Sequence, residues 1–437
     1  MVKQVDEIYS VFKEYPTVCT DSRKIIKNAI FFALKGDNFN GNEFAERALK
    51  DGCAYAVIDD PKFDKGNKYL LVDDALKMLQ ALAKLHRSLL TIPVIAITGS
   101  NGKTTTKELV NAVLSKKYRA HATHGNLNNH IGVPLTLLSI TDEAEIAVIE
   151  MGANHLGEIT LLCEIAEPAF GIITNIGKAH LEGFGSATNI IKAKGELYQY
   201  LKMNSGRAFV NCDDQVLMNL GKSLDLCTYG SGNYCHVTGK LIASDAHITF
   251  SWKSKKDSES IDQKEKVVSG LTGKYNFENI LAAICIGNYF NVSANDINRA
   301  IEEYVSTNNR SQVVKKGTNV ILLDAYNANP NSMTAAIENF SETKATKKIV
   351  VLGDMLELGS HSQEEHKRII ELLQSKKLDQ VVLVGPVFMK EGKSSKFKIF
   401  PGTEEASKYL KQQKLKNAHI LIKGSRGIKL ETLADVL

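Results

Sequence analysis

The chain has 437 residues, which suggests about three domains at roughly 150 residues each. Hydrophobic residues make up 43% of the sequence and charged residues 24%, so the chain can bury cores and does not belong to the disordered class. The formal net charge of +5, from 54 basic and 49 acidic residues, is too small to predict a nucleic-acid partner.

Targeting segments and cysteine patterns narrow the class of protein further. The first 15 residues are charged throughout and lack the apolar core of a secretion signal, and no apolar run approaches the ~18 residues of a membrane span. The seven cysteines are scattered and form no C-x-x-C pair, which argues against a zinc site or a disulfide framework. We therefore expect a protein of the reducing cytoplasm, without a membrane span.

The first part of the chain reads as a small α/β domain. Short apolar runs that end in Asp, at 55–60 and 69–74, predict strands, and leucines at helical spacing predict a helix over 74–90. After Pro93 the sequence pattern changes to a continuous apolar run, so we place the N-terminal domain at 1–91.

The middle part of the chain predicts a parallel α/β sheet. Val94 begins a continuous β-branched run, which is typical of a strand buried on both faces. A glycine loop and a predicted helix follow it. Further buried strands are predicted at 146–152, 170–177 and 207–214, and the polar segment 251–267 is predicted to be a surface loop. We place this domain at 92–308.

The last part of the chain alternates strands and helices. Strands are predicted at 319–326, 347–355, 380–386 and 418–425, with a helix over 363–374 between two of them. This alternation predicts a Rossmann-like, doubly wound sheet over 309–437, with ligands at the carboxyl ends of its strands.

The stretch TGSNGKTTTKE (98–108) predicts a phosphate-binding loop. A buried strand precedes it, glycines allow backbone N–H groups to close on phosphate oxygens, and a helix begins behind it. The usual pattern G-x-x-x-x-G-K-[ST] requires glycine at position 97, where this chain has Ile97, so the predicted loop is shorter than usual. The alternative is an ordinary glycine turn between a strand and a helix.

Other polar residues stand where apolar strands or helices meet loops. Glu150 ends a buried strand, which favours a Mg²⁺ ligand over a salt-bridged glutamate. His180, in a glycine-rich loop, is equally consistent with a ligand and with a structural hydrogen bond, whereas the helical position of Lys194, near Lys192, predicts a solvated side chain. Asn276 and Asn279 lie one helical turn apart and suit either a purine edge or a helix cap. A further strand-end residue, Asp324, suggests a ribose contact.

Together these motifs resemble the Mur ligase superfamily, which also includes folylpolyglutamate synthases, and most closely its MurF family. The residues that carry the resemblance span nearly the whole chain: TDSR (20–23), FFALKGDNFNG (31–41), TGSNGKTTTKE (98–108), GNLNNHIGVPLTLL (125–138), EMGANHLGEI (150–159), TNIGKAHLEGFGS (174–186), AKGEL (193–197), YNFENILAA (275–283), DAYNANPNSM (324–333), VLGDMLELG (351–359) and IKGSRGIKLE (422–431). The superfamily uses a short G-x-x-G-K-T loop, which accounts for the missing first glycine.

The resemblance implies a reaction and its cofactors. It implies an ATP-dependent amide ligase that joins D-Ala-D-Ala to UDP-N-acetylmuramoyl-tripeptide through an acyl phosphate, a cytoplasmic step of peptidoglycan precursor synthesis. The implied cofactors are ATP and Mg²⁺, with two ions expected, and the implied partners are small-molecule substrates of a monomeric enzyme. The implied domains bind UDP, bind ATP and close over both.

The resemblance also implies roles for individual residues. Residues implied to hold ATP are Gly99, Ser100, Asn101, Gly102, Lys103, Thr104, Thr105, Asn276, Asn279, Arg310 and Asp324. Residues implied to hold metal are Thr104, Glu150, His180 and a carbamylated Lys194, and those implied as catalytic are Lys103, Lys194 and His180. Residues implied to contact the other substrates are Thr20, Ser22, Arg23, Asn128, Asn129, Asn327 and Asn329.

Two positions depart from the family pattern, and other functions remain open. Tyr275 and Asn42 stand where histidine is common, which could alter adenine packing and substrate contacts. The alternatives are the ligase that adds the third amino acid, a folate polyglutamylator, or a nucleotide-binding switch that makes no amide bond. The DAYNANPNSM segment argues against the first two, and the substrate segments GNLNNHIGVP and TDSR argue against the third.

Overall fold

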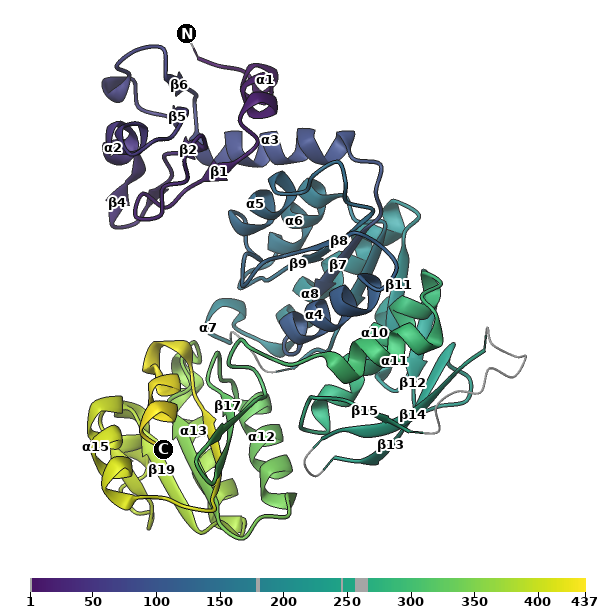
Figure 1. The fold of residues 1–437 in the computed structure, drawn as a ribbon, viewed down its shortest axis with the longest axis vertical. Coiled ribbons are helices and arrows are strands. Elements are labelled where there is room, and N and C mark those ends of the chain that lie inside the picture. Colours follow the sequence, from purple (N-terminus) through teal and green to yellow (C-terminus); the bar gives the residue numbers. More distant parts are fainter. Residues whose placement is uncertain (1, 178–180, 245–246, 256–265) are drawn as a thin grey trace.

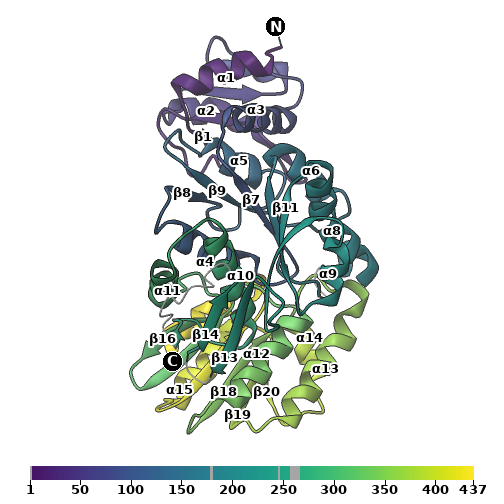
Figure 2. The same cartoon turned by 90° about the vertical axis from the view of Figure 1, so that its right-hand side faces the viewer.

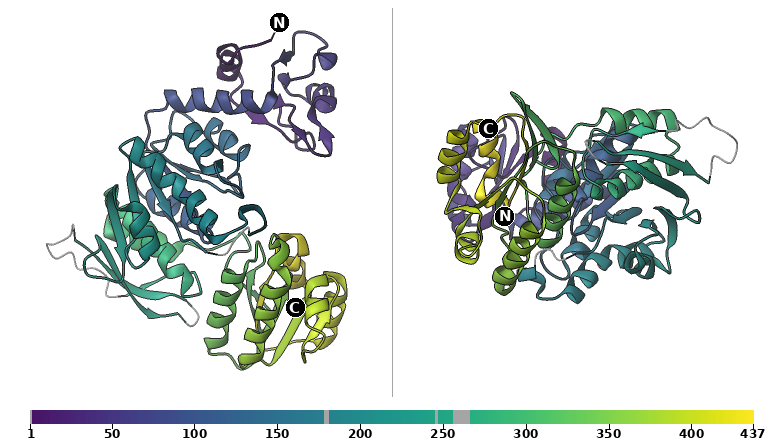
Figure 3. Two further views of the ribbon diagram at one scale, coloured as in Figure 1. Left: turned by 180° about the vertical axis from the view of Figure 1, so that it is seen from behind. Right: turned by 90° about the horizontal axis from the view of Figure 1, so that it is seen from below.

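The structure is a computed structural model, and it describes residues 2–177, 181–244, 247–255 and 266–437. Its three main sheets follow one another along the chain, as predicted, and Figure 1 shows the units built on them in purple, teal and green to yellow. The views in Figure 3 show these units along an arc, with the middle unit between the other two. We keep 1–91, 92–308 and 309–437 as their proposed bounds.

The N-terminal unit has a parallel four-stranded sheet of order β1-β2-β5-β6. Its strands are β1 (Val18–Cys19), β2 (Ile30–Phe32), β5 (Tyr55–Ile58) and β6 (Tyr69–Leu71). A small hairpin, β3 (Lys35–Gly36) and β4 (Phe39–Asn40), precedes α2 (Ala45–Lys50), and α1 (Val5–Glu14) begins the unit. Figure 2 shows α1, α2 and α3 at one end of the molecule.

Helix α3 (Ala75–Leu89) joins the N-terminal unit to the middle unit. Its N-cap Asp74 accepts a hydrogen bond from the Lys77 N–H, which defines where the helix begins. Leu79 and Leu82 are fully buried, and the helix packs against α1 on one side and α5 and α6 on the other. One continuous hydrophobic core therefore spans both units.

The middle unit has a nine-stranded sheet of order β15-β14-β13-β12-β11-β10-β7-β9-β8. The strands are β7 (Val94–Thr98), β8 (Ala120–Ala122), β9 (Ile146–Glu150), β10 (Phe170–Ile173), β11 (Arg207–Asn211), β12 (Asp225–Gly230), β13 (Val237–Ala243), β14 (Thr249–Ser254) and β15 (Val267–Val268). Only the pairings made by β14 are antiparallel. The parallel sheet predicted from sequence is thus confirmed for β7 to β13, and the antiparallel pairings of β14 extend it at one edge.

Helices cover both faces of the middle sheet. One face packs on α4 (Lys103–Leu114), α10 (Tyr275–Tyr289) and α11 (Ala294–Glu303). The other packs on α5 (Gly132–Leu138), α6 (Glu158–Ala166) and α8 (Ala187–Met203). Two short helices, α7 (Leu181–Phe184) and α9 (Gln215–Gly221), flank α8 in the chain.

The prediction of a surface loop over 251–267 is wrong at both ends of that segment. Residues up to Ser254 continue β14, and Val267–Val268 form β15. Phe250 and Trp252 are buried, and the indole N–H of Trp252 donates to Asn298 Oδ1 at 2.7 Å. The outward side chains of this edge hairpin are polar, which is why the sequence resembles a loop.

The C-terminal unit has a six-stranded sheet of order β16-β17-β21-β18-β19-β20, in which only β16 runs antiparallel to its neighbour. The strands are β16 (Gln312–Lys316), β17 (Asn319–Asp324), β18 (Lys348–Gly353), β19 (Gln380–Val384), β20 (Lys398–Phe400) and β21 (His419–Lys423). One face packs on α12 (Pro330–Glu342), α13 (Ser362–Ser375) and α14 (Pro386–Glu391), and the other on α15 (Thr403–Gln413) and the 3₁₀ turns of Leu430–Val436. The predicted doubly wound sheet is confirmed.

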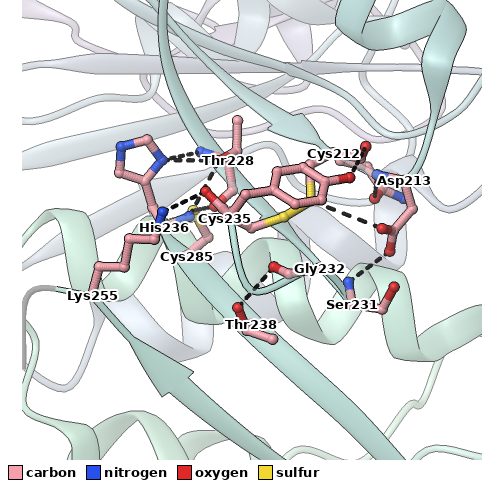
Figure 4. Close-up of a disulfide and its surroundings, with 12 residues drawn as sticks. Cys212, Asp213, Thr228, Ser231, Gly232, Cys235, His236, Thr238, Lys255 and Cys285 are labelled. Carbon is pink, nitrogen blue, oxygen red and sulfur yellow. Dashed lines mark hydrogen bonds between the residues drawn. A yellow bond between two sulfur atoms is a disulfide. The ribbon is translucent and has the colours of Figure 1, made fainter.

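A disulfide joins Cys212 and Cys235, a pairing that the sequence analysis did not predict (Figure 4). Cys212 directly follows β11, and Cys235 lies in the loop between β12 and β13. The N–H of Ser231, in that second loop, donates to Asp213 Oδ2 beside Cys212 at 2.7 Å. The pair is 23 residues apart in sequence, and strand order alone brings it together, so spacing could not reveal it. The other five cysteines are buried.

The junction between the first two units depends on Arg87, near the end of α3. Its buried guanidinium donates to the carbonyl oxygens of Ala166 at 2.8 Å, Glu167 at 3.1 Å and Leu90 at 2.7 Å. Arg87 therefore holds the end of α6 against α3 and sets the placement of the N-terminal unit.

We expect Arg87→Met to lower the free energy of unfolding by about 2–3 kcal/mol, because buried carbonyl oxygens lose charged donors. Urea unfolding followed by circular dichroism measures this. The control Arg47→Met removes an exposed arginine that pairs with Asp51 and should change stability by less than about 0.5 kcal/mol. Equal effects of the two substitutions would contradict the role of Arg87.

Candidate active site

A cavity of about 730 Å³ lies between the middle and C-terminal units. Parallel strands end at one edge of a sheet, so the segments after β7, β9 and β10 share one wall. The segments after β17 and β21 form the opposite wall. The fold thus brings together the predicted phosphate loop, Glu150 and the DAYNANPNSM segment.

The phosphate loop occupies the turn between β7 and α4, as predicted. Gly99 and Gly102 have φ values of 143° and 80°, in the region that favours glycine. A Cβ on Gly99 would lie 2.0 Å from Thr174 Oγ1, and one on Gly102 would lie 2.5 Å from Asn279 Oδ1. Ile97 is fully buried within β7, so the strand occupies the position where longer loops have their first glycine.

The segment after β10 holds the loop in place. Asn175 Oδ1 accepts a hydrogen bond from the Asn101 N–H at 3.0 Å, and Thr174 Oγ1 donates to the Asn101 carbonyl at 2.6 Å. The Ser100 hydroxyl donates to the Gly177 carbonyl at 3.0 Å. These contacts fix the loop backbone before any ligand binds. Sequence reasoning did not single out Thr174 or Asn175 for this role.

Lys103 begins α4 and folds back over the loop. Its Nζ donates to the carbonyl oxygens of Gly99 at 2.6 Å and Ser100 at 3.3 Å. Burial lowers the pKa of Lys103, the charge of Glu150 opposes that shift, and Arg310 adds to it. The first turn of α4 therefore presents a cation beside free backbone N–H groups, an arrangement that suits polyphosphate.

Glu150 ends β9 inside the protein with one oxygen available. Its Oε1 accepts a 2.7 Å hydrogen bond from Asn128 Nδ2, and its N–H donates to Thr123 Oγ1 at 2.9 Å. Its Oε2 is buried and has no hydrogen-bond partner within the described ranges. A carboxylate oxygen left in this state beside Lys103 and Thr104 is suited to a hard cation.

Lys194, on α8, lies fully inside the protein. Its Nζ contacts the Ala153 carbonyl at a long 3.4 Å and lies 5.4 Å from the Phe184 ring centre. Burial, with a further contribution from the charge of Lys103, lowers the pKa of Lys194 to about 7. The expectation of a solvated lysine therefore does not hold, because the side chain points inward beneath the cavity wall.

The two asparagines predicted to read a purine are largely engaged with the protein. Asn276 Nδ2 donates to the Thr272 carbonyl at 2.8 Å and to Ser311 Oγ at 3.1 Å. Asn279 Nδ2 donates to Asn276 Oδ1 at 2.9 Å, and Asn279 Oδ1 accepts from Thr106 Oγ1 at 3.1 Å. Both line the cavity and tie α10 to α4 and to the linker that leads to β16.

The charged residues of the C-terminal wall contact neighbouring side chains. The Arg310 guanidinium stacks 3.7 Å from the Tyr326 ring centre, and its Nε is buried without a partner among the residues described. Asp324 Oδ2 accepts from Lys423 Nζ at 2.7 Å. Sequence reasoning missed Lys423, although a lysine that ends the apolar strand HILIK carries the same signal as Glu150 at the end of β9.

Asn329 connects the two walls. It is the N-cap of α12, where its Oδ1 accepts from the Ser332 N–H at 2.9 Å. Its Nδ2 donates to Asn101 Oδ1 in the phosphate loop at 2.7 Å. Asn327, by contrast, is exposed to the cavity. Asn129 Oδ1 accepts from the Gly132 N–H at the start of α5 at 2.9 Å, and Asn129 also lines the cavity.

Other predicted residues lie outside this cavity. Thr20, Ser22 and Arg23 are on the loop after β1, where Arg23 pairs with Asp21. Asn42 is buried and bonds to Asp59, so it acts within the N-terminal unit. His180 lies outside the described residues.

Tyr275, the other departure from the family pattern, lines the cavity and bonds to Ser311 Oγ at 2.8 Å.

Within the ranges that the structure describes, no three His, Cys, Asp or Glu side chains are grouped to hold a metal ion. No helix of this part of the chain is long and apolar enough to cross a membrane.

Comparison with known proteins places these features in a family. Three family models match: Mur ligase family, catalytic domain, over 14–87; Mur ligase middle domain, over 97–287; and Mur ligase, glutamate ligase domain, over 309–426. The UDP-N-acetylmuramoyl-tripeptide–D-alanyl-D-alanine ligase of Bacillus subtilis (strain 168) is 37% identical over 432 residues, which cover 96% of this chain and 92% of that one. The Escherichia coli (strain K12) ligase of the same name is 34% identical, with 84% and 81% covered.

Solved structures agree with the sequence comparison. A crystal structure of MurF from Acinetobacter baumannii superposes with a TM-score of 0.85 at 32% identity, covering 96% of this chain and 93% of that one. MurF from Thermotoga maritima in complex with ADP has a TM-score of 0.83 at 28% identity, with 96% of each chain covered.

Proposed function

Because the chain belongs to the UDP-N-acetylmuramoyl-tripeptide–D-alanyl-D-alanine ligases of the Mur ligase family, we propose that it joins D-Ala-D-Ala to UDP-N-acetylmuramoyl-tripeptide with ATP. The observation that carries this proposal is the cavity in which a phosphate loop of one unit faces the DAYNANPNSM segment of the next. The product feeds peptidoglycan synthesis, and a cytoplasmic, monomeric enzyme is proposed.

The reaction proceeds in two steps. The terminal carboxylate of the tripeptide attacks the γ-phosphorus of ATP, and the bond from that phosphorus to the β-γ bridging oxygen breaks. The products of this step are an acyl phosphate and ADP. The amine of D-Ala-D-Ala then attacks the acyl carbon, the carbon–oxygen bond to phosphate breaks, and a proton leaves the nitrogen. No side-chain nucleophile is needed, so the protein acts by alignment and by stabilising negative charge.

The phosphate loop is proposed to hold the ATP polyphosphate. Backbone N–H groups of 102–105 close on phosphate oxygens, Lys103 neutralises the outer phosphates, and the Thr104 hydroxyl would bind a metal ion. A Mg²⁺ ion fits here because it binds one or two carboxylates together with substrate phosphates and needs no cluster of protein ligands. Glu150 Oε2 is the carboxylate oxygen available to it. When bound, Mg²⁺ neutralises charge on the phosphates.

Lys194 is proposed to act as a carbamate. A neutral lysine amine adds carbon dioxide to give a carbamate and a proton, and a pKa of about 7 keeps much of the amine neutral near physiological pH. The modified side chain would be an anion with two hard oxygens, suited to a second Mg²⁺. Its burial beside Ala153 supports this role, and His180 is proposed as a further metal ligand.

The remaining wall is proposed to bind the rest of ATP and the amine. Arg310 lies ready to contact phosphate, and Asp324, held by Lys423, to contact ribose. Since the amides of Asn276 and Asn279 bond mainly to protein groups, we propose that they shape the adenine wall. Asn327 is the asparagine whose side chain is most available to D-Ala-D-Ala, while Asn329 aligns the two walls.

The N-terminal unit is proposed to bind the UDP part of the substrate through Thr20, Ser22 and Arg23. Asn128 and Asn129 line the cavity on the side that faces this unit, because Gln80 of α3 donates to the carbonyl of the adjacent His130 at 3.0 Å. Substrate bound to both units would extend along this side.

We expect Lys103→Ala to lower kcat by roughly 10²–10³, because the loop loses a preorganised cation at the transferring phosphate. ADP release measures the rate, and circular dichroism checks the fold. The control is Lys202→Ala, an exposed lysine in the last turn of α8, which should turn over normally. Near-normal turnover of a folded Lys103→Ala variant would remove the loop from the proposed mechanism.

We expect carbamylation of Lys194 to increase as the pH rises through about 7, since the folded-state pKa is depressed and the neutral amine predominates above it. ¹³C-bicarbonate added at pH 8 should give a carbamate signal by NMR that fades at pH 6. Lys194→Ala should lose activity and regain part of it with acetate. The control Lys192→Ala removes an exposed lysine of the same helix and should keep both signal and activity. A wild type without the signal, or a Lys194→Ala variant with full activity, contradicts the carbamate.

We expect D-Ala-D-Ala to outperform D-Ala, L-Lys and L-Glu by up to about 10⁴ in kcat/KM, because a site built for particular polar groups rejects ligands that leave them unpaired. ADP release with UDP-N-acetylmuramoyl-tripeptide and each amine measures this. Asn327→Ala should weaken use of the dipeptide more than it raises the KM for ATP, whereas Asn233→Ala, exposed on the loop before β13, should change neither. Faster reaction of a folate with L-Glu, or hydrolysis of ATP without any amine, would assign the chain to another function.

A further inference from the structure

Lys107 is a buried lysine to which the proposed reaction gives no role. It lies one helical turn after Lys103 on α4, and only 2% of its surface is exposed. Its Nζ donates to the Thr123 carbonyl at 2.6 Å and to the Gly125 carbonyl at 3.4 Å, and the Glu108 carboxylate lies 3.9 Å away. A lysine is rarely buried to this extent without a strong reason, since removing its charge from water is costly.

The two carbonyl groups belong to the segment 123–129, which follows β8 and leads to α5. This segment makes both of the contacts that hold Glu150. Thr123 Oγ1 accepts from the Glu150 N–H at 2.9 Å, and Asn128 Nδ2 donates to Glu150 Oε1 at 2.7 Å. The segment is also joined to β9 and the residues after it: the Thr123 N–H donates to the Val148 carbonyl at 3.0 Å, and the Asn128 carbonyl accepts from the Gly152 N–H at 2.7 Å. Lys107 links the other end of this segment, at Thr123 and Gly125, to the helix of the phosphate loop.

We propose that Lys107 is a positioning residue for the metal site: its ammonium ties the segment 123–129 to α4, and the segment in turn aims the free oxygen of Glu150 into the nucleotide cavity. The proposal deepens the proposed function, since it rests on Glu150 as a Mg²⁺ ligand. Lys107 itself touches neither substrate nor metal, because the cavity is lined by Lys103 to Thr105 of this helix and not by Lys107.

The geometry explains why a cation is needed at this place. The Thr123 carbonyl lies inside the protein and must be given a donor, and the Gly125 carbonyl of the same turn, nearer the surface, points to the same ammonium. A neutral apolar side chain of the same length would fill the space and leave the buried Thr123 carbonyl unpaired. The segment would then relax away from α4, and Asn128 would no longer fix the rotamer of Glu150. Groups that orient metal ligands in this way typically contribute 10–100-fold to metal affinity.

The test compares ADP binding with and without Mg²⁺ by isothermal titration calorimetry, so that no turnover is needed. In the wild type, Mg²⁺ should tighten ADP binding. In Lys107→Met we expect this Mg²⁺ effect to fall about tenfold, while ADP binding in EDTA changes less than about threefold. The control Lys117→Met removes a lysine that also donates to a carbonyl, that of Asn291 at 2.9 Å, but at the protein surface. It should bind as the wild type does.

A double-mutant cycle tests the route through the segment. Asn128→Ala should lower the Mg²⁺ effect by itself, and Lys107→Met combined with Asn128→Ala should be little worse than either alone, since both act through the same contact with Glu150. Additive losses would show that Lys107 does not act through this segment. A folded Lys107→Met variant with the full Mg²⁺ effect would overturn the proposal.

Three further outcomes have different consequences for the proposal. If Lys107→Met does not fold, Lys107→Gln, which keeps a donor on a shorter side chain, takes its place with the same expected loss, and an unchanged Mg²⁺ effect there overturns the proposal. If wild-type ADP binding does not depend on Mg²⁺ and Glu150→Gln binds ADP normally, the proposed metal site fails, and the inference about Lys107 fails with it. A Mg²⁺ effect lost in Glu150→Gln but kept in Lys107→Met refutes only the role of Lys107.

Discussion

The whole site depends on the fixed backbone of four residues, 99–102, between β7 and α4. Asn101 is at its centre: its backbone bonds to Thr174 and Asn175 of the middle unit, and its side chain accepts from Asn329 of the C-terminal unit. A shift of this loop would therefore move both walls of the cavity. The polyphosphate site and the alignment of the two catalytic units are, in this structure, one constraint.

The unusual burial of charged groups follows from that constraint. Glu150, at the end of β9, and Lys194, on α8, are both buried. Glu150 Oε2 has no hydrogen-bond partner among the described residues, and Lys194 Nζ makes only a long contact with the Ala153 carbonyl, so both charges have fewer partners than burial requires. In a purely structural core, such groups would be replaced by apolar ones or by full ion pairs. Their persistence here is consistent with a ligand that brings its own charge, namely a polyphosphate with its metal ions.

Sequence reasoning was most successful where chemistry and local pattern coincide. The strand–glycine–lysine–helix pattern predicts the phosphate loop, and a charged residue at the end of an apolar strand predicts Glu150. It was least successful for asparagines, because an amide serves equally well as ligand, helix cap or bridge. Asn129 accepts from the first N–H of α5, Asn329 caps α12 and bridges to Asn101, and Asn276 bonds to Ser311, none of which spacing alone could distinguish.

The sequence by itself determined the family, the three α/β units and the position of the glycine loop between β7 and α4, since these depend on hydrophobic periodicity and on contiguous motifs that are read within a few residues. Only the tertiary structure decided which distant groups meet: the disulfide of Cys212 with Cys235, the pairing of Asp324 with Lys423, the edge strand β14, and the inward turn of Lys194. The physical reason is that these contacts depend on strand order and on how helices and loops pack against the sheet within each unit, and neither has a local signature in the chain.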